Sequence, residues 1–103
     1  MHHLDKINKK IIQYKNDDIY IIFYTPSCSY CQRTLALLDK YNLKYKGYNI
    51  DNIRGNIRRV IDSLIKYKSI TNFQETHKTK PIIFYKGEFV GGFTELQSKL
   101  ENK

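Results

Sequence analysis

The chain has 103 residues, a formal net charge of +8 and two cysteines. This length suits one domain with its own core, so we expect a single domain over residues 1–103. No apolar run approaches the roughly 18 residues that span a bilayer, and residues 1–6 lack the apolar core of a signal peptide. These features predict a protein of the cytoplasm, a reducing compartment, without a membrane partner.

The positive charge is scattered along the sequence. Clustered Lys and Arg are one signature of nucleic-acid binding, but pairs such as Lys9-Lys10 and Arg58-Arg59 stand isolated here. The chain is also rich in Ile, Asn and Tyr, which with Lys is typical of AT-rich coding. We therefore interpret the charge as a solvated surface and do not expect nucleic acid as a partner.

An amphipathic helix is predicted at the start of the chain, over residues 3–15. Its apolar side chains recur every three or four residues, the spacing of one helix face. They are Leu4, Ile7, Ile11 and Tyr14. Residues 16–18 interrupt this pattern, so the helix forms an extension, residues 1–16, ahead of the first strand.

Two strands and a helix are predicted next. Residues 19–24 are continuously apolar, as in a central strand that is covered on both faces. Residues 29–40 have a helical pattern with leucines on the inner side, and residues 43–50 alternate apolar and polar side chains. The alternation shifts at Gly47, where we expect a β-bulge.

The clearest helical period follows. Five apolar residues fall at i, i+3, i+4, i+7 and i+8, which predicts a helix over about residues 53–68. They are Ile57, Val60, Ile61, Leu64 and Ile65. Residues 69–80 are polar and are predicted to form a long connection.

A hairpin and a helix complete the chain. Residues 81–85 and 88–90 are predicted strands, joined by a two-residue turn at Lys86-Gly87. The last helix is predicted over 95–102, with a capping box that begins at Thr94. Parallel units come first and a hairpin comes last, which predicts an α/β fold: a four-stranded mixed sheet flanked by helices on both faces.

Cys28 and Cys31 form a Cys-x-x-Cys pair at a predicted strand-to-helix junction. The first turn of a helix has unpaired N–H groups and partial positive charge. A thiol there ionises more readily, and thiolate is the form that attacks disulfides. A structural disulfide across so short a loop would constrain little of the unfolded chain. The pair is therefore the candidate reactive site.

A metal site is not predicted from the residues. Structural zinc takes four ligands, and beyond the two cysteines the chain offers only three histidines, none with paired zinc spacing. These are His2, His3 and His77.

Three motifs together resemble the glutaredoxin branch of the thioredoxin fold, over about residues 19–100. Cys28-Ser29-Tyr30-Cys31 resembles the family's Cys-Pro-Tyr-Cys, and Thr79-Lys80-Pro81 resembles its Thr-Val-Pro. Residues 91–95, Gly-Gly-Phe-Thr-Glu, resemble its Gly-Gly-x-Thr/Asp-Asp/Glu. The resemblance implies a thioredoxin-like fold to which the helix over 3–15 is an addition.

The same resemblance implies a glutathione-dependent thiol–disulfide oxidoreductase of the dithiol type. Cys28 would be the nucleophile, and Cys31 would resolve its mixed disulfides or remain a spectator where glutathione does so. Glutathione would be the co-substrate. The partners would be glutathionylated or disulfide-containing proteins.

A glutathione site is also implied by the resemblance. Pro81 would be cis and face Cys28, so that the backbone of Lys80 pairs with an extended tripeptide. The N–H groups of Phe93 and Thr94 would hold the α-carboxylate of the γ-glutamyl arm. Tyr30 would form a wall of the site, and Lys66 would meet the glycyl carboxylate. The other expected contacts are Thr25 and Gly92.

Two further functions remain open. Some family members with serine at the position of Ser29 dimerise around a 2Fe–2S cluster, held by the first motif cysteine and glutathione, which makes Cys28 a candidate ligand. A thioredoxin-like hydrogen donor served by a reductase is the other alternative, because Thr25-Pro26 stands where the family often has a cation. We expect a monomer, or a dimer if a cluster binds.

Overall fold

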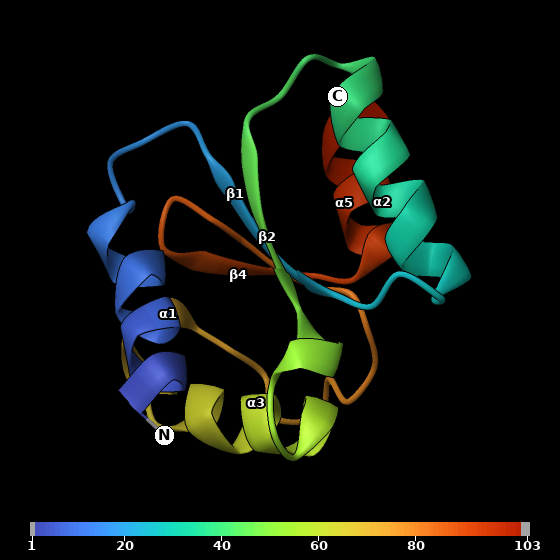
Figure 1. Cartoon of the computed structure of the whole chain (residues 1–103). Coiled ribbons are helices and arrows are strands. Elements are labelled where there is room, and N and C mark those ends of the chain that lie inside the picture. Colours follow the sequence, from blue (N-terminus) through green and yellow to red (C-terminus); the bar gives the residue numbers. More distant parts are fainter. Residues whose placement is uncertain (1, 102–103) are drawn as a thin grey trace.

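The computed structural model describes residues 2–101, which form a sheet between two layers of helices (Figure 1). The strands are β1 (Tyr20–Tyr24), β2 (Tyr45–Asn49), β3 (Ile82–Tyr85) and β4 (Glu88–Gly91). They lie in the order β2-β1-β3-β4, with β1 and β2 parallel and the other two pairs antiparallel. This confirms the four-stranded mixed sheet predicted from the sequence.

Helices cover both faces of the sheet, as predicted. Figure 1 shows α1 (His2–Gln13) and α3 (Asn56–Ile65) on one side, and α2 (Ser29–Lys40) and α5 (Phe93–Glu101) on the other. Two short helical segments are the 3-10 turn η1 (Ile50–Asn52) and α4 (Lys68–Thr71). Within residues 2–101, no helix has the length and apolar character needed to cross a membrane.

The strand β1 is buried on both of its faces. Successive side chains of a strand point to opposite sides. Ile21 and Phe23 accordingly pack in the core layer beneath α1 and α3, while Tyr20 and Ile22 pack in the layer beneath α2 and α5. This arrangement confirms the prediction of a covered central strand and explains why the segment has no polar side.

The N-terminal helix α1 belongs to one of these core layers. Leu4, Ile7 and Ile11 are buried and lie in the same cluster as the apolar face of α3. Asn8 is buried beside them, and its Nδ2 donates to Ser63 Oγ on α3 at 2.8 Å. The helix is therefore held by apolar packing and by one buried polar contact.

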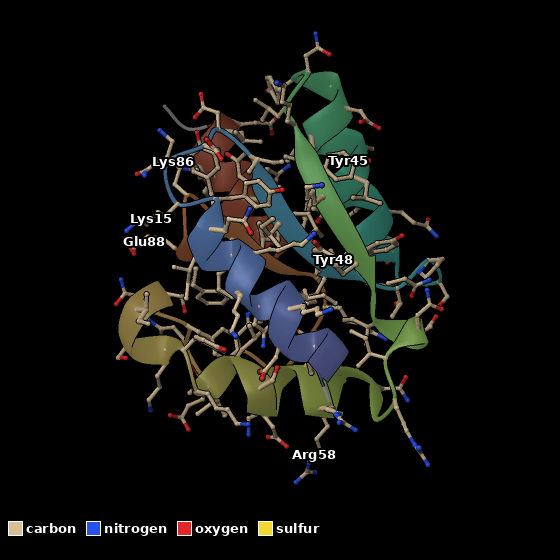
Figure 2. The ribbon with its side chains drawn as sticks, turned by 60° about the vertical axis from the view of Figure 1, so that its left-hand side comes forward. Lys15, Tyr45, Tyr48, Arg58, Lys86 and Glu88 are labelled. Atoms are coloured by element: carbon tan, nitrogen blue, oxygen red, sulfur yellow. The ribbon has the colours of Figure 1, made fainter. Side chains whose placement is uncertain are left out.

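The cations labelled in Figure 2 lie on separate parts of the surface. Arg58 projects from α3 at the bottom of the view, while Lys15 and Lys86 lie at its left, near the β3–β4 turn. The ion pairs found within residues 2–101 are all exposed: Lys40–Glu101, Lys68–Glu75 and Lys86–Asp18. Exposed pairs of this kind contribute little to stability.

The predicted bulge at Gly47 is wrong. The register of β1 with β2 is regular, and Gly47 lies opposite Ile22. A Cβ at Gly47 would lie 2.9 Å from Cε1 of Tyr24, so the glycine makes room for that ring. The register shift in the sheet lies instead between β3 and β4, at Ile83 and Phe84.

The helix predicted over 53–68 is shorter than expected. Gly55 has a left-handed conformation with φ of 90°, so α3 begins only after it, at Asn56. The helix ends at Ile65, and α4 then occupies the start of the connection that was predicted to be irregular over 69–80.

The last helix begins earlier than predicted. It starts at Phe93, and the Gly92 N–H donates to Glu95 Oε1 at 2.7 Å. The side chain that caps the helix is therefore Glu95, and the predicted capping box at Thr94 is displaced by two residues. Of the predicted span 95–102, residue 102 lies outside the described residues.

We predict that Ile11→Ala lowers the free energy of unfolding by about 2–5 kcal/mol, because Ile11 is buried and its loss leaves a cavity between α1 and the sheet. Chemical denaturation measures this change. Lys9→Ala, an exposed change in the same helix, is the control and should stay within about 0.5 kcal/mol of the parent. Equal stabilities of Ile11→Ala and the parent would show that α1 is not part of the cooperative core.

Candidate active site

Strand pairing gathers three segments of the chain at one edge of the sheet. Phe23 lies opposite Ile82, and Ile83 lies opposite Gly91, in antiparallel pairs. The segment after β1 therefore meets the segment before β3 and the segment after β4. These segments carry the two cysteines, Lys80-Pro81 and residues 92–95.

Cys28 lies at the N-terminus of α2 and is partly exposed. Its backbone is extended, with φ of −86° and ψ of 120°, and its Sγ accepts a hydrogen bond from the Cys31 N–H at 3.2 Å. The Cys28 N–H donates to the carbonyl of Thr25 at 3.2 Å. The sulfur thus combines access from solvent with a position at the positive end of the α2 dipole.

Cys31 has a different environment, because it is fully buried in the first turn of α2. Burial raises the pKa of the Cys31 thiol to about 12, and the hydrogen bond with Cys28 acts in the same direction. A backbone hydrogen bond from Thr25 and the charge of Lys80 oppose this rise and are outweighed. At neutral pH Cys31 therefore keeps its proton.

The segment before β3 faces Cys28. The Lys80–Pro81 bond is cis, as the resemblance implied. The Cys28 thiol donates to the carbonyl of Lys80 across 3.7 Å between sulfur and oxygen. The carbonyl of Pro81 accepts a hydrogen bond from His77 Nε2 at 3.1 Å. Both carbonyls therefore accept a hydrogen bond, that of Lys80 from Cys28 and that of Pro81 from His77.

A hollow of about 280 Å³ lies beside these residues and is called the groove below. It is lined by Tyr30, His77, Thr79, Lys80, Pro81, Gly92, Phe93, Thr94 and Glu95. The groove brings together all the residues predicted to bind glutathione except Thr25 and Lys66. It also lies directly beside the reactive sulfur, because Lys80 contacts Cys28.

An aromatic wall borders the groove. Tyr30 is 53% exposed, and its ring lies 6.0 Å from that of Phe93, centroid to centroid. The Arg33 guanidinium lies 5.5 Å from the Tyr30 centroid and 5.7 Å from the Phe93 centroid. Such cation–π contacts stabilise the pair of rings. Arg33 therefore places a positive charge at the rim of the groove.

Two of the predicted glutathione contacts lie outside the groove. Thr25 is buried, and its carbonyl accepts from Cys28, so it supports the cysteine loop from beneath. Lys66 lines a separate hollow between α1 and α3, together with Asp5 and Asp62. This hollow shares no lining residue with the groove, and the contact of Lys66 with a glycyl carboxylate stays a prediction.

His77 and Glu95 line the groove, but neither was predicted as a binding residue. His77 lies on the irregular connection after α4, where no periodic pattern marks its direction. Glu95 belongs to the third motif, but its contact with Gly92 was not expected. The motif itself was the signal that could have identified Glu95.

The described residues do not form a metal centre by themselves. Among residues 2–101, no group of three or more His, Cys, Asp or Glu side chains is placed to hold a metal ion. One chain supplies one accessible thiol, Cys28. A 2Fe–2S cluster therefore fits these residues only if a second copy and external thiols complete the ligand set.

A Cys-x-x-Cys pair at a helix N-terminus, opposite a cis-proline and on a sheet of this order, defines a thiol–disulfide oxidoreductase of thioredoxin-like fold. The family model that describes glutaredoxins matches residues 20–90. The chain belongs to the glutaredoxin family.

Individual relatives agree with this assignment. A probable glutaredoxin of Acanthamoeba polyphaga mimivirus is 48% identical over 82 residues, which are 80% of this chain and 77% of the relative. Human mitochondrial glutaredoxin-2 is 33% identical over 81 residues, which are 78% of this chain and 44% of the relative. The crystal structure of a buckwheat glutaredoxin–glutathione complex has a TM-score of 0.69 at 22% identity, covering 98% of this chain and 84% of that one. That likeness shows the thioredoxin-like fold.

We predict that iodoacetamide at pH 8 alkylates Cys28 in the folded protein and leaves Cys31 unmodified. With a pKa of about 12, only roughly one Cys31 in ten thousand is thiolate at that pH, and the fraction rises tenfold per pH unit. Mass spectrometry of tryptic peptides measures the labelling. The same protein in denaturant is the control and should be labelled at both cysteines. Comparable native labelling of the two would contradict the burial of Cys31.

Proposed function

We propose that this protein is a glutathione-dependent oxidoreductase that reduces glutathionylated and disulfide-containing proteins in a reducing, cytoplasmic compartment. One observation carries the proposal: the accessible sulfur of Cys28 lies beside a groove walled by Tyr30, Lys80 and the start of α5. The buckwheat relative of similar fold was crystallised with glutathione, which supports a tripeptide in the equivalent space.

The reaction begins with attack of the Cys28 sulfur on the glutathione sulfur of a glutathionylated protein. A disulfide forms between Cys28 and glutathione, while the protein leaves as a thiolate and takes a proton from solvent. The N–H of Cys31 and the positive end of α2 favour negative charge on Cys28 Sγ before attack. A second glutathione thiolate then attacks the bound glutathione sulfur, releasing glutathione disulfide and restoring Cys28.

Glutathione would lie extended along the groove. The backbone of Lys80 faces it from one side, next to the cysteine. The first N–H groups of α5, at Phe93 and Thr94, have no partner within the helix and are placed to bind an α-carboxylate. Tyr30 closes the outer wall through its contact with Phe93. The groove thus offers a helix N-terminus, a peptide backbone and an aromatic ring to one ligand.

Protein disulfides would follow a second route, in which the Cys28 sulfur first joins the substrate cysteine and releases its partner thiol. Cys31 then loses its proton and attacks Cys28 Sγ, freeing the substrate thiol and leaving a Cys28–Cys31 disulfide. Two glutathione molecules reduce this bond, and one glutathione disulfide leaves. The proposal places glutathione, and not a thioredoxin reductase, as the source of electrons.

We predict that Cys28→Ser abolishes turnover of both glutathionylated and disulfide substrates, because no accessible sulfur remains. Cys31→Ser should retain turnover of a glutathionylated peptide and lose that of a protein disulfide. Coupled assays with glutathione and glutathione reductase measure both rates, and thioredoxin reductase in place of glutathione is the second arm. The proposal fails if Cys28→Ser keeps its activity, or if only the reductase arm supports turnover.

We further predict that Thr94→Pro raises KM for a glutathione mixed disulfide about tenfold, because proline removes one N–H that would bind the carboxylate. The first turn of a helix tolerates proline, so α5 should persist. Thr94→Ala is the matched control, since it keeps the N–H and loses only the hydroxyl, and its KM should stay near that of the parent. Circular dichroism confirms that both variants are folded. If the KM of Thr94→Pro equals that of Thr94→Ala, the Thr94 N–H does not bind the carboxylate.

A further inference from the structure

A second hollow, of about 460 Å³, adjoins the groove. His77 and Glu95 line both spaces, so the two are direct neighbours. The other walls of the second hollow come from the connection between α4 and β3 and from β4. The reaction with glutathione described above uses the groove and leaves this space without a role.

The backbone at the boundary of the two hollows has no side chains, because it is Gly91-Gly92, and both glycines are buried. A Cβ at Gly91, where φ is 128°, would lie 2.7 Å from Glu95 Cγ, and one at Gly92 would lie 3.2 Å from His77 Cε1. A larger residue at either position would displace a side chain that both hollows share. The space above this backbone is thus filled by Glu95 and His77, and a ligand that extends from the groove to the second hollow lies against these two side chains.

The lining of the second hollow suits a polypeptide. Gln74 and Thr76 are exposed there and offer amide and hydroxyl groups, which donate and accept the hydrogen bonds that a peptide backbone requires. Phe89 adds an apolar surface, its ring packed edge-on against His77 with centroids 5.2 Å apart. Glu95 is the acidic side chain of this lining, and it already accepts from the Gly92 N–H. The space is therefore not built to attract an anion.

We propose that the second hollow binds the polypeptide that flanks the reactive cysteine of a disulfide substrate. The substrate chain would run from Cys28 along Lys80, through the groove and past His77 and Glu95, which line both hollows. Glutathione, as a tripeptide, ends within the groove, whereas a protein continues into the second hollow. This inference rests on the proposed function and adds to it a site that distinguishes protein disulfides from glutathione mixed disulfides.

The test compares two substrates: an extended peptide whose single cysteine is disulfide-linked to 2-mercaptoethanol, and glutathione linked to 2-mercaptoethanol in the same way. In each, the Cys28 sulfur attacks the cysteine sulfur, and 2-mercaptoethanol leaves. Gln74→Trp fills the second hollow, and Gln97→Trp, on α5 outside both hollows, is the matched control. We expect Gln74→Trp to lower kcat/KM for the peptide about tenfold and to leave that for glutathione within about twofold. The control should leave both unchanged.

Equal losses on both substrates, or no loss on the peptide, would overturn the inference. A parent protein that fails to turn over the glutathione substrate would instead contradict the proposed function. Binding is measured separately by NMR on Cys28→Ser, with a peptide in which serine replaces cysteine. That peptide should shift the amide resonances of Gln74 and Thr76, while glutathione shifts those of Phe93 and Thr94. Unmoved resonances at Gln74 and Thr76 would also overturn it.

Discussion

The pairing of β1 with β3 is the interaction on which the whole site depends. With Phe23 opposite Ile82, the end of one strand lies beside the start of the other, and the loops that carry Cys28 and Lys80 must face each other. Both strands are buried on both faces, so a slip of one residue would send Phe23 into the layer built for Ile22. The register is therefore fixed by packing, and it holds two irregular loops in a defined relation.

Helices and strands with a regular pattern of apolar residues could be predicted from the sequence. The bounds of α2 matched the predicted span 29–40, and the central position of β1 followed from its continuous apolar run. The helix predicted over 53–68 was too long, because its apolar period says nothing about the left-handed conformation at Gly55. The role of Gly47 was likewise hidden, since the ring of Tyr24 reaches it only across the sheet.

The candidate site likewise contains residues that the sequence predicts and residues that it does not. Cys28, Pro81 and Phe93 were predicted because each belongs to a short contiguous motif, and the sheet then brings the three motifs together. Lys66 was predicted from its charge at a helix end, and charge alone does not give the direction of a side chain. His77 was missed, because its contact with the carbonyl of Pro81 exists only after the connection folds back over the groove.

The two thiols differ because α2 is amphipathic. Cys31 shares the buried face with Thr34 and Leu38, three and seven residues further on, whereas Cys28 lies just outside the helix. The packing that holds α2 on the sheet therefore buries one sulfur and leaves the other accessible. In the proposed reaction, glutathione reaches Cys28 from solvent directly, but Cys31 must lose a tightly held proton before it attacks. Because the apolar period of α2 buries Cys31, reduction of the mixed disulfide on Cys28 by glutathione is favoured over attack by Cys31. Attack by Cys31 becomes competitive where a bound substrate opens the first turn of α2.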